Sequence, residues 1–280
     1  MSELKSAPVE PPLLEPLTVV AIACNEAENA AEWAEHLSFA DRVVVVDAGS
    51  RDGTGDILRE AGVHVEPWDV DGRVLIHEGK NRAIRCVERG WILDLDLDER
   101  VSLPLVEELE SLRRQPPSAA AYGIPFRHYV FGRWLEHGGW CDRHLRLFRA
   151  GKVSYPEDRA HSTPVIDGEI GALEEAIFHF AHPSLHEFVV KMNRYTSEDS
   201  PRILEHGRGG LRNRPPLPES PLRWTRGALS VFWNRYVKAA GFRDGVPGFL
   251  VAALLASYFH VEQAKVWERK HHAFADEESA

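Results

Sequence analysis

The segment Asp96-Leu97-Asp98-Glu99 gathers carboxylates at the end of a stretch, 91–97, in which apolar and acidic residues alternate. On a strand, the side chains of Asp96 and Asp98 would point to the same side and could share one divalent cation. Mg²⁺ or Mn²⁺ held there would neutralise charge that builds on a leaving phosphate. A solvated strand end is the competing interpretation, and Asp94 leaves open which two acids form the pair.

A second polar segment, Asp47-Ala48-Gly49-Ser50-Arg51-Asp52-Gly53-Thr54, follows a run of valines. Small residues such as Gly49 and Ser50 let a ligand approach the backbone closely. Asp47 stands at the end of the expected strand and could accept hydrogen bonds from a nucleobase or a ribose. An ordinary turn, in which a Ser or Asp caps the next helix, explains the same residues.

Four expected strands position these polar segments, and helices alternate with them. Asn25 is expected to cap the first helix, with Glu28 completing a capping box. Ser102 is placed to cap another helix, and Pro104 falls in its first turn. The expected strands are 17–23, 42–46, 63–67 and 91–97, and the helices between them include 54–61 and 80–89.

This order of elements predicts an α/β fold with a mostly parallel, doubly wound sheet. Ligands in such sheets bind beyond the carboxyl ends of the strands. Three polar segments fall there: 24–26, 47–54 and 96–98. Their shared location is a stronger signal than any one of them alone.

The composition and the hydrophobic pattern of the sequence change after Pro117. Residues 121–148 are typical of strands, 185–198 of a helix and 201–221 of a Pro- and Arg-rich linker. A helical C-terminal appendage is expected over 223–270, with a break near 241–248. The predicted domains are a disordered tail (1–16), the first half of the α/β domain (17–117), its second half (118–200), a linker (201–222) and a helical segment (223–280).

Composition limits the classes of protein to consider. The chain has 280 residues, of which 44% are hydrophobic, so a large core can form. A net charge of −10 opposes a nucleic-acid partner. Three widely spaced cysteines favour a reduced, cytoplasmic protein. Residues 1–16 lack the apolar core of a signal peptide, and no run reaches the roughly 18 apolar residues that span a bilayer.

Taken together, the motifs resemble the family 2 glycosyltransferases. The resemblance runs through "VVAIACNEAENAAEW", "VVVVDAGSRDGT", "GKNRAI" and "WILDLDLDERV". It implies a fold of the GT-A type, in which 17–117 is the nucleotide-sugar-binding half and 118–200 the acceptor-binding half. It also matches Asp96 and Asp98 to the family's Asp-x-Asp motif, with Asp94 outside it.

The second half is similar to the lipopolysaccharide inner-core glucosyltransferase branch of that family. The motifs are "RHYVFGRWLEHGGWCDRHLRLFRAG", "IFHF", "KMNRYT" and "GFRDGVPGFLVAALLASYFHVEQAK". Two positions depart from that branch. Trp140-Cys141-Asp142 replaces a Trp-Tyr-Pro-Asp segment, and His161-Ser162 replaces His-Glu, so the acceptor side matches less closely than the donor side.

The resemblance assigns roles to individual residues. Asp98, helped by Asp96, is expected to hold Mg²⁺ or Mn²⁺ on the diphosphate of the donor, with His161 or His179 as a possible further ligand. The remaining donor-binding residues are expected to be Asn25, Glu26, Asp47, Gly49, Ser50, Lys80 and Asn81.

An inverting transfer also needs a general base that takes the proton of the acceptor hydroxyl group. Asp142 and Asp158 are the two candidates, and the sequence does not choose between them. Asp142 lies in a Gly-Gly-Trp segment that would face the acceptor, whereas Asp158 ends the segment Pro-Glu-Asp. Either could instead be a surface acid paired with Arg143 or Arg159.

The C-terminal part is basic within an acidic protein. Residues 202–243 carry nine Lys or Arg and two acids, interleaved with aromatic residues, and an apolar run, 249–259, follows. This composition favours peripheral binding to an anionic membrane surface. A core helix surrounded by solvated arginines is the alternative.

These features together predict an inverting transfer of a hexose from a nucleotide-sugar donor, expected to be UDP-linked, at the inner face of the cell membrane. The acceptor would be a saccharide or a lipid-linked saccharide used in cell-surface glycan synthesis. A haloacid-dehalogenase-type phosphohydrolase is one alternative, because Asp94-Leu95-Asp96 mimics its nucleophile motif. A non-catalytic membrane-surface module is the other, favoured mildly by Ser162.

Overall fold

The computed structural model describes residues 14–70, 76–156, 163–207, 210 and 216–277. The chain divides into two compact units. The first comprises Met1–Phe126 and Arg143–His179, and the second comprises Arg127–Asp142 and Phe180–Ala280. The expected tail 1–16 falls mostly outside the described residues, and so do residues 208–209 and 211–215 of the expected linker.

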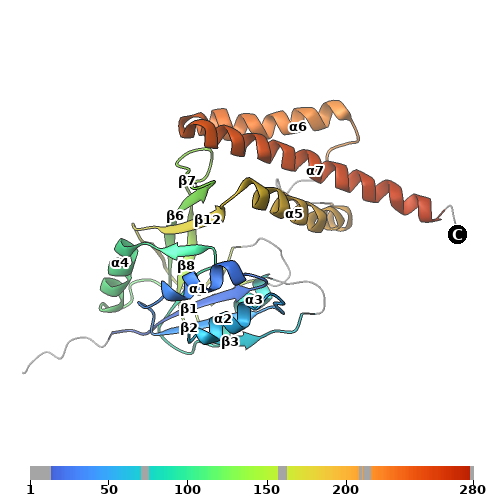
Figure 1. The fold of residues 1–280 in the computed structure, drawn as a ribbon. Helices are drawn as coiled ribbons and strands as arrows, with labels where there is room; N and C mark the ends of the chain where they lie inside the picture. The colour runs from blue at the N-terminus through green and yellow to red at the C-terminus, as the bar shows by residue number, and fades with distance from the viewer. Residues whose placement is uncertain (1–13, 71–75, 157–162, 208–209, 211–215, 278–280) are drawn as a thin grey trace, which may run out of the picture. The chain divides into compact units, whose positions relative to one another are not determined.

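One part of the main sheet, in the first unit, is parallel, in the order β3-β2-β1-β4. Figure 1 labels three of these strands, β1, β2 and β3. The strands of this part are β1 (Leu17–Ala23), β2 (Arg42–Asp47), β3 (His64–Pro67) and β4 (Trp91–Asp94). The helices that alternate with them are α1 (Ala27–Glu35), α2 (Thr54–Glu60) and α3 (Ile76–Arg85).

Alternating apolar residues bury both faces of this part of the sheet. Val19 and Val45 pack into one core with Trp33 of α1, whereas Val20 and Val44 join a second core with α3. Side chains alternate along a strand, so continuous valine runs serve two cores at once. The expected doubly wound α/β class is confirmed.

The remaining strands pair mainly in the antiparallel sense. The sheet continues from β4 through β8 (Arg143–Arg149), β6 (Ala121–Val130) and β12 (Ile177–His182) to β5 (Glu99–Val101). The shorter strands are β7 (Arg133–Trp134), β9 (Val153–Ser154), β10 (Val165–Ile166) and β11 (Ile170–Ala172). Helix α4 (Leu103–Arg113) follows β5, and the hydroxyl group of Ser102 accepts the Leu105 N–H as expected of its cap.

Helices dominate the second unit, as the sequence predicts. They are α5 (Leu185–His206), α6 (Pro221–Trp233) and α7 (Gly245–Glu277), and both α5 and α6 pack on α7. Their shared core includes Phe188, Val231, Val251, Leu255 and Phe259. The expected break is present as a π-helical turn (Asn234–Lys238) and a 3₁₀ turn (Gly241–Asp244).

Three expected boundaries were wrong. Helix α1 begins at Ala27 after Glu26, because Asn25 takes a left-handed conformation with φ of 56° instead of capping the helix. Helix α3 already contains Gly79, whose missing side chain leaves room for Ile22 and Trp68. Strand β4 ends at Asp94, so Asp96 and Asp98 lie beyond the strand.

One further boundary, in the C-terminal half, was wrong. Residues Pro201–His206 belong to α5 and not to a linker. By length and composition alone, 241–271 could cross a membrane, although the uninterrupted apolar run is short. A third of the most apolar window of this segment is buried inside the protein.

Candidate functional site

The carboxyl ends of β1 and β2 are joined by hydrogen bonds between two polar segments. The Asn25 N–H donates to Oγ of Ser50 at 2.9 Å, and the Arg51 N–H donates to Oδ1 of Asn25 at 2.9 Å. The left-handed backbone of Asn25 makes this exchange possible, since it turns the chain away from a helical path before α1 begins. Asn25 and Ser50, both expected at the donor site, therefore lie together.

Asp52 and Thr54 extend the same connection. Oγ1 of Thr54 accepts the Glu26 N–H at 2.8 Å, and Oδ2 of Asp52 accepts the Ala27 N–H at 3.0 Å. Asp52 also accepts the N–H and the hydroxyl of Thr54, so one carboxylate serves the start of two helices. A helix cap by a Ser or Asp of this segment was the alternative to a ligand site, and Asp52, two positions before the first helical residue Thr54, makes hydrogen bonds of that kind.

Asp47 lies at the end of β2 and accepts the Ser50 N–H at 3.0 Å. Gly49 is exposed in a left-handed turn between them. The first turn of α2 approaches the Asp47 carboxylate so closely that a Cβ atom at Gly55 would lie 2.6 Å from its Oδ2. Gly55 therefore leaves the space that this carboxylate occupies.

A buried cluster of ionic groups lies at the end of β4. Nζ of Lys80 donates to both oxygens of Asp94, at 2.9 and 2.8 Å, and lies 3.3 Å from Oδ1 of Asp96. Arg146 of β8 approaches Oδ2 of Asp94 at 3.4 Å and Oδ2 of Asp96 at 3.0 Å. The hydroxyl of Tyr155 donates to Asp94 at 2.7 Å. Asp94 thus anchors both cations.

Asn81 fixes the segment that carries Tyr155. Its side chain donates to the Tyr155 carbonyl and accepts the Tyr155 N–H, both at 2.8 Å. The ring of His77 stacks on that of Tyr155, with centroids 5.3 Å apart. Lys80 and Asn81, which were expected near the nucleotide, are therefore both buried parts of this cluster.

Burial and charge set the protonation of the acids. Burial alone would raise the pKa of Asp96, but Lys80 and Arg146 outweigh it and hold that pKa well below its usual range. Burial raises the pKa of Glu99 to about 8, although Arg146, 2.6 Å away, opposes the shift. Glu99 therefore keeps its proton at neutral pH, whereas Asp96 is ionised.

Asp98 takes a different partner from Asp96. Its Oδ2 lies 3.5 Å from Nε2 of His179 on β12, and each side chain is 24% exposed. The ligand atoms of Asp98, Glu99 and His179 lie within 4.8 Å of one another. Carboxylate oxygen and imidazole nitrogen are donors that suit Mn²⁺ and related divalent cations. Asp98 and His179, both accessible to solvent, therefore fit a metal site, and Glu99 lies beside them.

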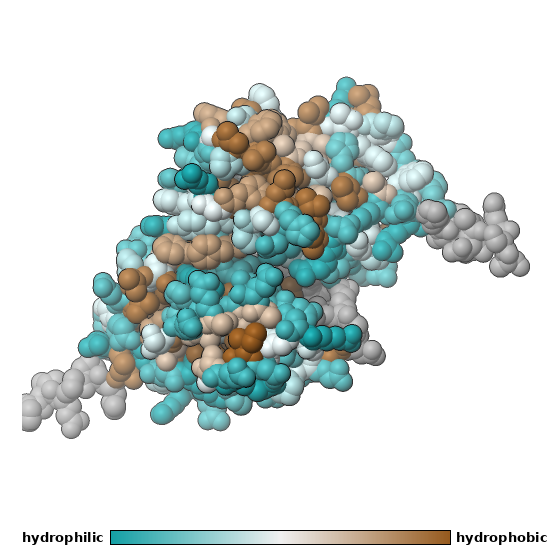
Figure 2. All heavy atoms as spheres, viewed as in Figure 1, coloured by the Kyte–Doolittle hydropathy of each residue, from teal (hydrophilic) through white to brown (hydrophobic). Residues whose placement is uncertain are grey.

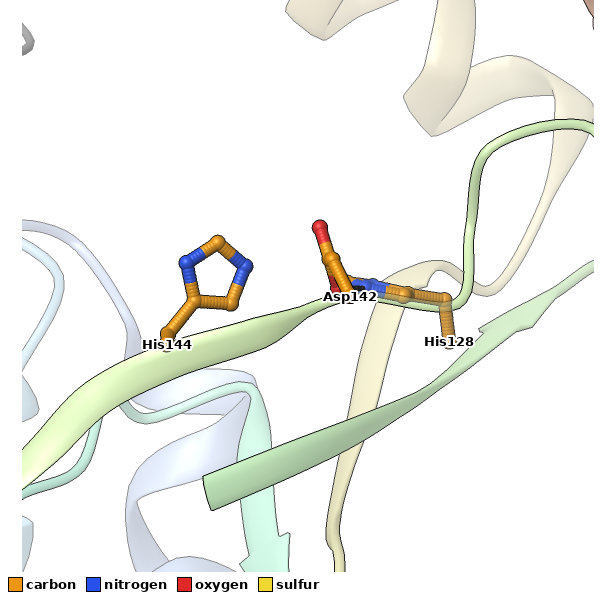
Figure 3. Close-up of side chains that lie close together, drawn as sticks. All are labelled: His128, Asp142 and His144. Carbon is orange, nitrogen blue, oxygen red and sulfur yellow. Dashed lines mark hydrogen bonds and ion pairs between the residues drawn. The ribbon is translucent and has the colours of Figure 1, made fainter. Parts of the chain in front are cut away.

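The candidate base Asp142 belongs to the second unit. Its Oδ1 lies 2.7 Å from Nε2 of His128 (Figure 3). The buried ring of His128 packs edge-on against Trp140. The Asp142 side chain is 43% exposed. Figure 3 also draws His144, which belongs to β8. A buried imidazole can orient an exposed carboxylate, which suits a general base.

The surface-acid alternative for Asp142 named Arg143 as a partner. In the structure, Arg143 donates to the Gly123 carbonyl at 2.9 Å, in the first unit. The other candidate base, Asp158, lies outside the described residues, as do Arg159, His161 and Ser162.

The phosphohydrolase alternative needs Asp94 as an exposed nucleophile. Its side chain is 1% exposed and is engaged by Lys80, Arg146 and Tyr155. A carboxylate shielded in this way cannot attack a phosphate, so the structure argues against that alternative.

Arg146, Tyr155 and His128 were not among the predicted site residues, and Glu99 was named without a role. Arg146 gave one signal, because a cation in the middle of an otherwise apolar strand segment, "LRLF", needs a buried partner. His179 was named only from the family resemblance, and its pairing with Asp98 joins residues far apart in the chain.

No family model matches the chain. Among curated proteins, it is 26% identical to the lipopolysaccharide core biosynthesis glycosyltransferase LpsC of Rhizobium meliloti, over 91% of this chain and 93% of that protein. An uncharacterized glycosyltransferase of Rickettsia felis is also 26% identical, over 91% of this chain and 90% of its own length. These relatives confirm the resemblance to glycosyltransferases.

Among solved structures, the chain is similar to the mannosyltransferase PcManGT from Pyrobaculum calidifontis, in complex with GDP-Man and Mn²⁺. The TM-score is 0.49 at 16% identity, covering 94% of this chain and 90% of that one.

Proposed function

We propose that this chain, a glycosyltransferase, moves a hexose from a UDP-linked donor to a saccharide or lipid-linked saccharide, with inversion at the anomeric carbon. The proposal includes the GT-A type and a place at the inner face of the cell membrane. The motifs of the first half support the donor class. The similarity to LpsC, a protein of lipopolysaccharide core biosynthesis, supports an acceptor in cell-surface glycan synthesis.

The observation that carries this proposal is the Asp98–His179 pair beside the Lys80–Asp96–Arg146 cluster. Asp98 and His179 would hold a divalent cation, with Glu99 close by. Such a cation would stabilise the negative charge of the departing diphosphate. Asp96 was expected to share the metal directly, but its oxygens are engaged by the two cations, so we assign it the role of holding them in place.

The charge balance of the cluster favours a metal requirement. Lys80 and Arg146 are matched by the carboxylates of Asp94 and Asp96, and Glu99 keeps its proton at neutral pH. The cluster therefore has little positive charge to spare for a diphosphate. The additional charge would have to come from a cation at Asp98 and His179.

The connected polar ends of β1 and β2 suit the nucleoside part of the donor. Asp47 offers carboxylate oxygens at the strand end, and Asn25 and Ser50 are fixed next to each other by hydrogen bonds. Groups that are held in place before a ligand arrives lose less entropy on binding. We propose that Asp47 accepts hydrogen bonds from the base or the ribose hydroxyls.

For the transfer step, we propose Asp142 as the general base, oriented by His128. The acceptor hydroxyl oxygen attacks the anomeric carbon while the bond from that carbon to the phosphate oxygen breaks. The hydroxyl proton passes to the Asp142 carboxylate, and the nucleoside diphosphate leaves with the bonding electrons. Attack from the side opposite the leaving group inverts the configuration.

Transfer and donor hydrolysis, measured with a panel of nucleotide sugars and a titration of Mn²⁺ or Mg²⁺, test the proposal. Asp98→Asn should abolish metal-dependent turnover and weaken Mn²⁺ binding, which can be measured separately by electron paramagnetic resonance. Asp167→Asn, an exposed acid of the same unit paired with Lys152, is the matched control. Full activity of Asp98→Asn, or of the wild type in excess chelator, would exclude the metal role.

A further inference from the structure

The junction of α6 and α7 carries an exposed apolar surface, which Figure 2 shows as brown residues over these helices. We call residues 222–250 the elbow. Val246 is 70% exposed, and several other large apolar side chains of the elbow are at least 42% exposed. Its exposed apolar residues are Leu222, Leu229, Trp233, Phe242, Val246, Phe249 and Leu250.

Helical spacing places these side chains on defined faces. On α6, Leu222, Leu229 and Trp233 follow one another at intervals of two turns and one turn, and exposed Arg226 falls on the same stripe. On α7, Val246, Phe249 and Leu250 lie on one face of the first turns. Each helix thus buries one side in the shared core and leaves the opposite side apolar.

Ring contacts hold the elbow together. The ring of Tyr236 lies 5.1 Å from Phe232, 6.3 Å from Phe242 and 5.7 Å from Phe249, measured between centroids. These four aromatics connect the end of α6, the 3₁₀ turn and the start of α7. The exposed side chains therefore sit on a packed base and not on a loose loop.

The exposed charges of the elbow are all positive. Arg223, Arg226, Lys238 and Arg243 are exposed. The single carboxylate between residues 221 and 260 is Asp244, and it is 8% exposed.

Asp244 is also engaged on the inside of the unit. It accepts the His137 N–H at 2.9 Å and pairs with the ring of the same residue. Its negative charge is therefore turned away from the surface that the exposed cations share.

We propose that the elbow docks on an anionic lipid bilayer, with its apolar side chains in the headgroup region and its cations on the lipid phosphates. Exposed apolar groups beside basic residues are the combination that such a surface binds. This inference rests on the proposed function in one respect: docking would bring the enzyme to a lipid-linked acceptor.

Helix α7 lies on the bilayer in this proposal and does not cross it, although the segment 241–271, most of which belongs to α7, is long and apolar enough. Val251, Leu255 and Phe259 are committed to the core of the second unit. Glu262 and Gln263 are buried as well. A bilayer span would have to remove these side chains from their present partners.

The lipid-facing residues assigned from the structure differ from those predicted from the sequence. The sequence pointed to the basic stretch 202–243 and to the run 249–259. Within that run, Val251, Ala252, Leu255, Tyr258 and Phe259 are buried, while Phe249 and Leu250 are exposed. Arg212 and Arg214 lie outside the described residues, so the docking surface is assigned to the elbow alone.

Flotation of the full chain with vesicles that contain phosphatidylglycerol tests the proposal. The double variant Val246→Glu, Phe249→Glu should lower the bound fraction at least about tenfold. Leu185→Glu, at an exposed apolar position of α5 in the same unit, should bind as the wild type does. Equal binding by the wild type and the double variant would overturn the proposal.

Charge-reversal variants and the depth to which Trp233 enters the bilayer give two further tests. A triple variant of the elbow, with Arg226→Glu, Lys238→Glu and Arg243→Glu, should lose vesicle binding at low salt. The matched control changes the net charge equally in the first unit and should keep vesicle binding. It carries Arg85→Glu, Arg89→Glu and Arg114→Glu. Brominated lipids should quench part of the tryptophan fluorescence in the wild type, and less in Trp233→Phe.

Turnover on a soluble acceptor separates this inference from the proposed function. The elbow variants should keep that turnover, so lost vesicle binding with normal turnover supports the docking surface. Wild-type protein that stays off the vesicles yet dimerises, with the dimer lost in Val246→Glu, would assign the elbow to a protein interface and overturn the inference.

Discussion

The hydroxyl group of Tyr155 donates a hydrogen bond to Oδ2 of Asp94 at 2.7 Å, on the carboxylate that also binds Lys80. Burial, with the Asp94 charge beside it, raises the pKa of Tyr155 far above its usual value, so Tyr155 stays a donor at any working pH. Asp94 is therefore held by two cations, Lys80 of α3 and Arg146 of β8, and by one neutral hydrogen-bond donor, Tyr155. It acts as the fixed point around which the donor-side cations are arranged.

Tyr155→Phe should destabilise the fold by about 1–3 kcal/mol, because a buried carboxylate loses one of its donors. Urea unfolding measures this cost. Tyr195→Phe, at an exposed tyrosine, should change stability by much less. Equal stability of Tyr155→Phe and the wild type would mean that Asp94 is satisfied without this hydrogen bond.

Glu99 should make stability depend on pH. Its pKa is raised from 4.5 to about 8 in the folded protein, so the folded state holds a proton that the unfolded state releases. The stabilisation is complete below about pH 4.5 and is lost as the pH rises through 8, with a slope of roughly 1.4 kcal/mol per pH unit.

Glu99→Gln should remove this slope. Unfolding curves between pH 5.5 and about 8.5 in chelator, compared with those of the exposed Glu107→Gln, check the expectation. If the wild type and Glu99→Gln follow the same pH dependence, Glu99 is ionised in the folded protein.

Asp142→Asn should lower turnover by about a hundredfold or more while leaving the donor KM nearly unchanged, because only the proton transfer is lost. His128→Gln should have a smaller effect, since it removes the orienting group and not the base. Steady-state kinetics with Glu136→Gln as control measures both. Asp158→Asn is assayed alongside, and near-normal turnover of Asp142→Asn with loss in Asp158→Asn would move the base to Asp158.

Gly55→Ala should raise the donor KM at least about tenfold, because the added Cβ would displace the Asp47 carboxylate. Stability should hardly fall, since Ala favours a helix more than Gly does by up to about 1 kcal/mol. Asp47→Ala and the double variant complete a cycle. Additive losses in the double variant would show that Gly55 acts independently of Asp47.

Most of the fold was predictable from local sequence patterns. The valine runs of β1 and β2, the cap at Ser102 and the break between α6 and α7 follow from neighbouring residues, and the structure confirms them. The cap expected at Asn25 failed because its side chain bonds to a segment that is distant in sequence. Propensity rules do not include such a partner.

The candidate site was predictable only where its residues form a continuous motif. Asp96 and Asp98 stand out by spacing, but their different partners, Arg146 and His179, come from strands that follow much later in the chain. The two acids were therefore predictable from their spacing, whereas the charged partners that decide their protonation were not. Only the paired strands bring those charges to the acids.

The two units interleave along the chain, because residues 127–142 leave the first unit and residues 143–179 return to it. During synthesis, β1 to β4 emerge from the ribosome long before β8 and β12. Arg146, a partner of Asp94, and His179, the partner of Asp98, are then still missing. Asp94 would therefore be buried with only part of its compensating charge. We therefore expect the first unit to complete its folding only after most of the chain has been translated.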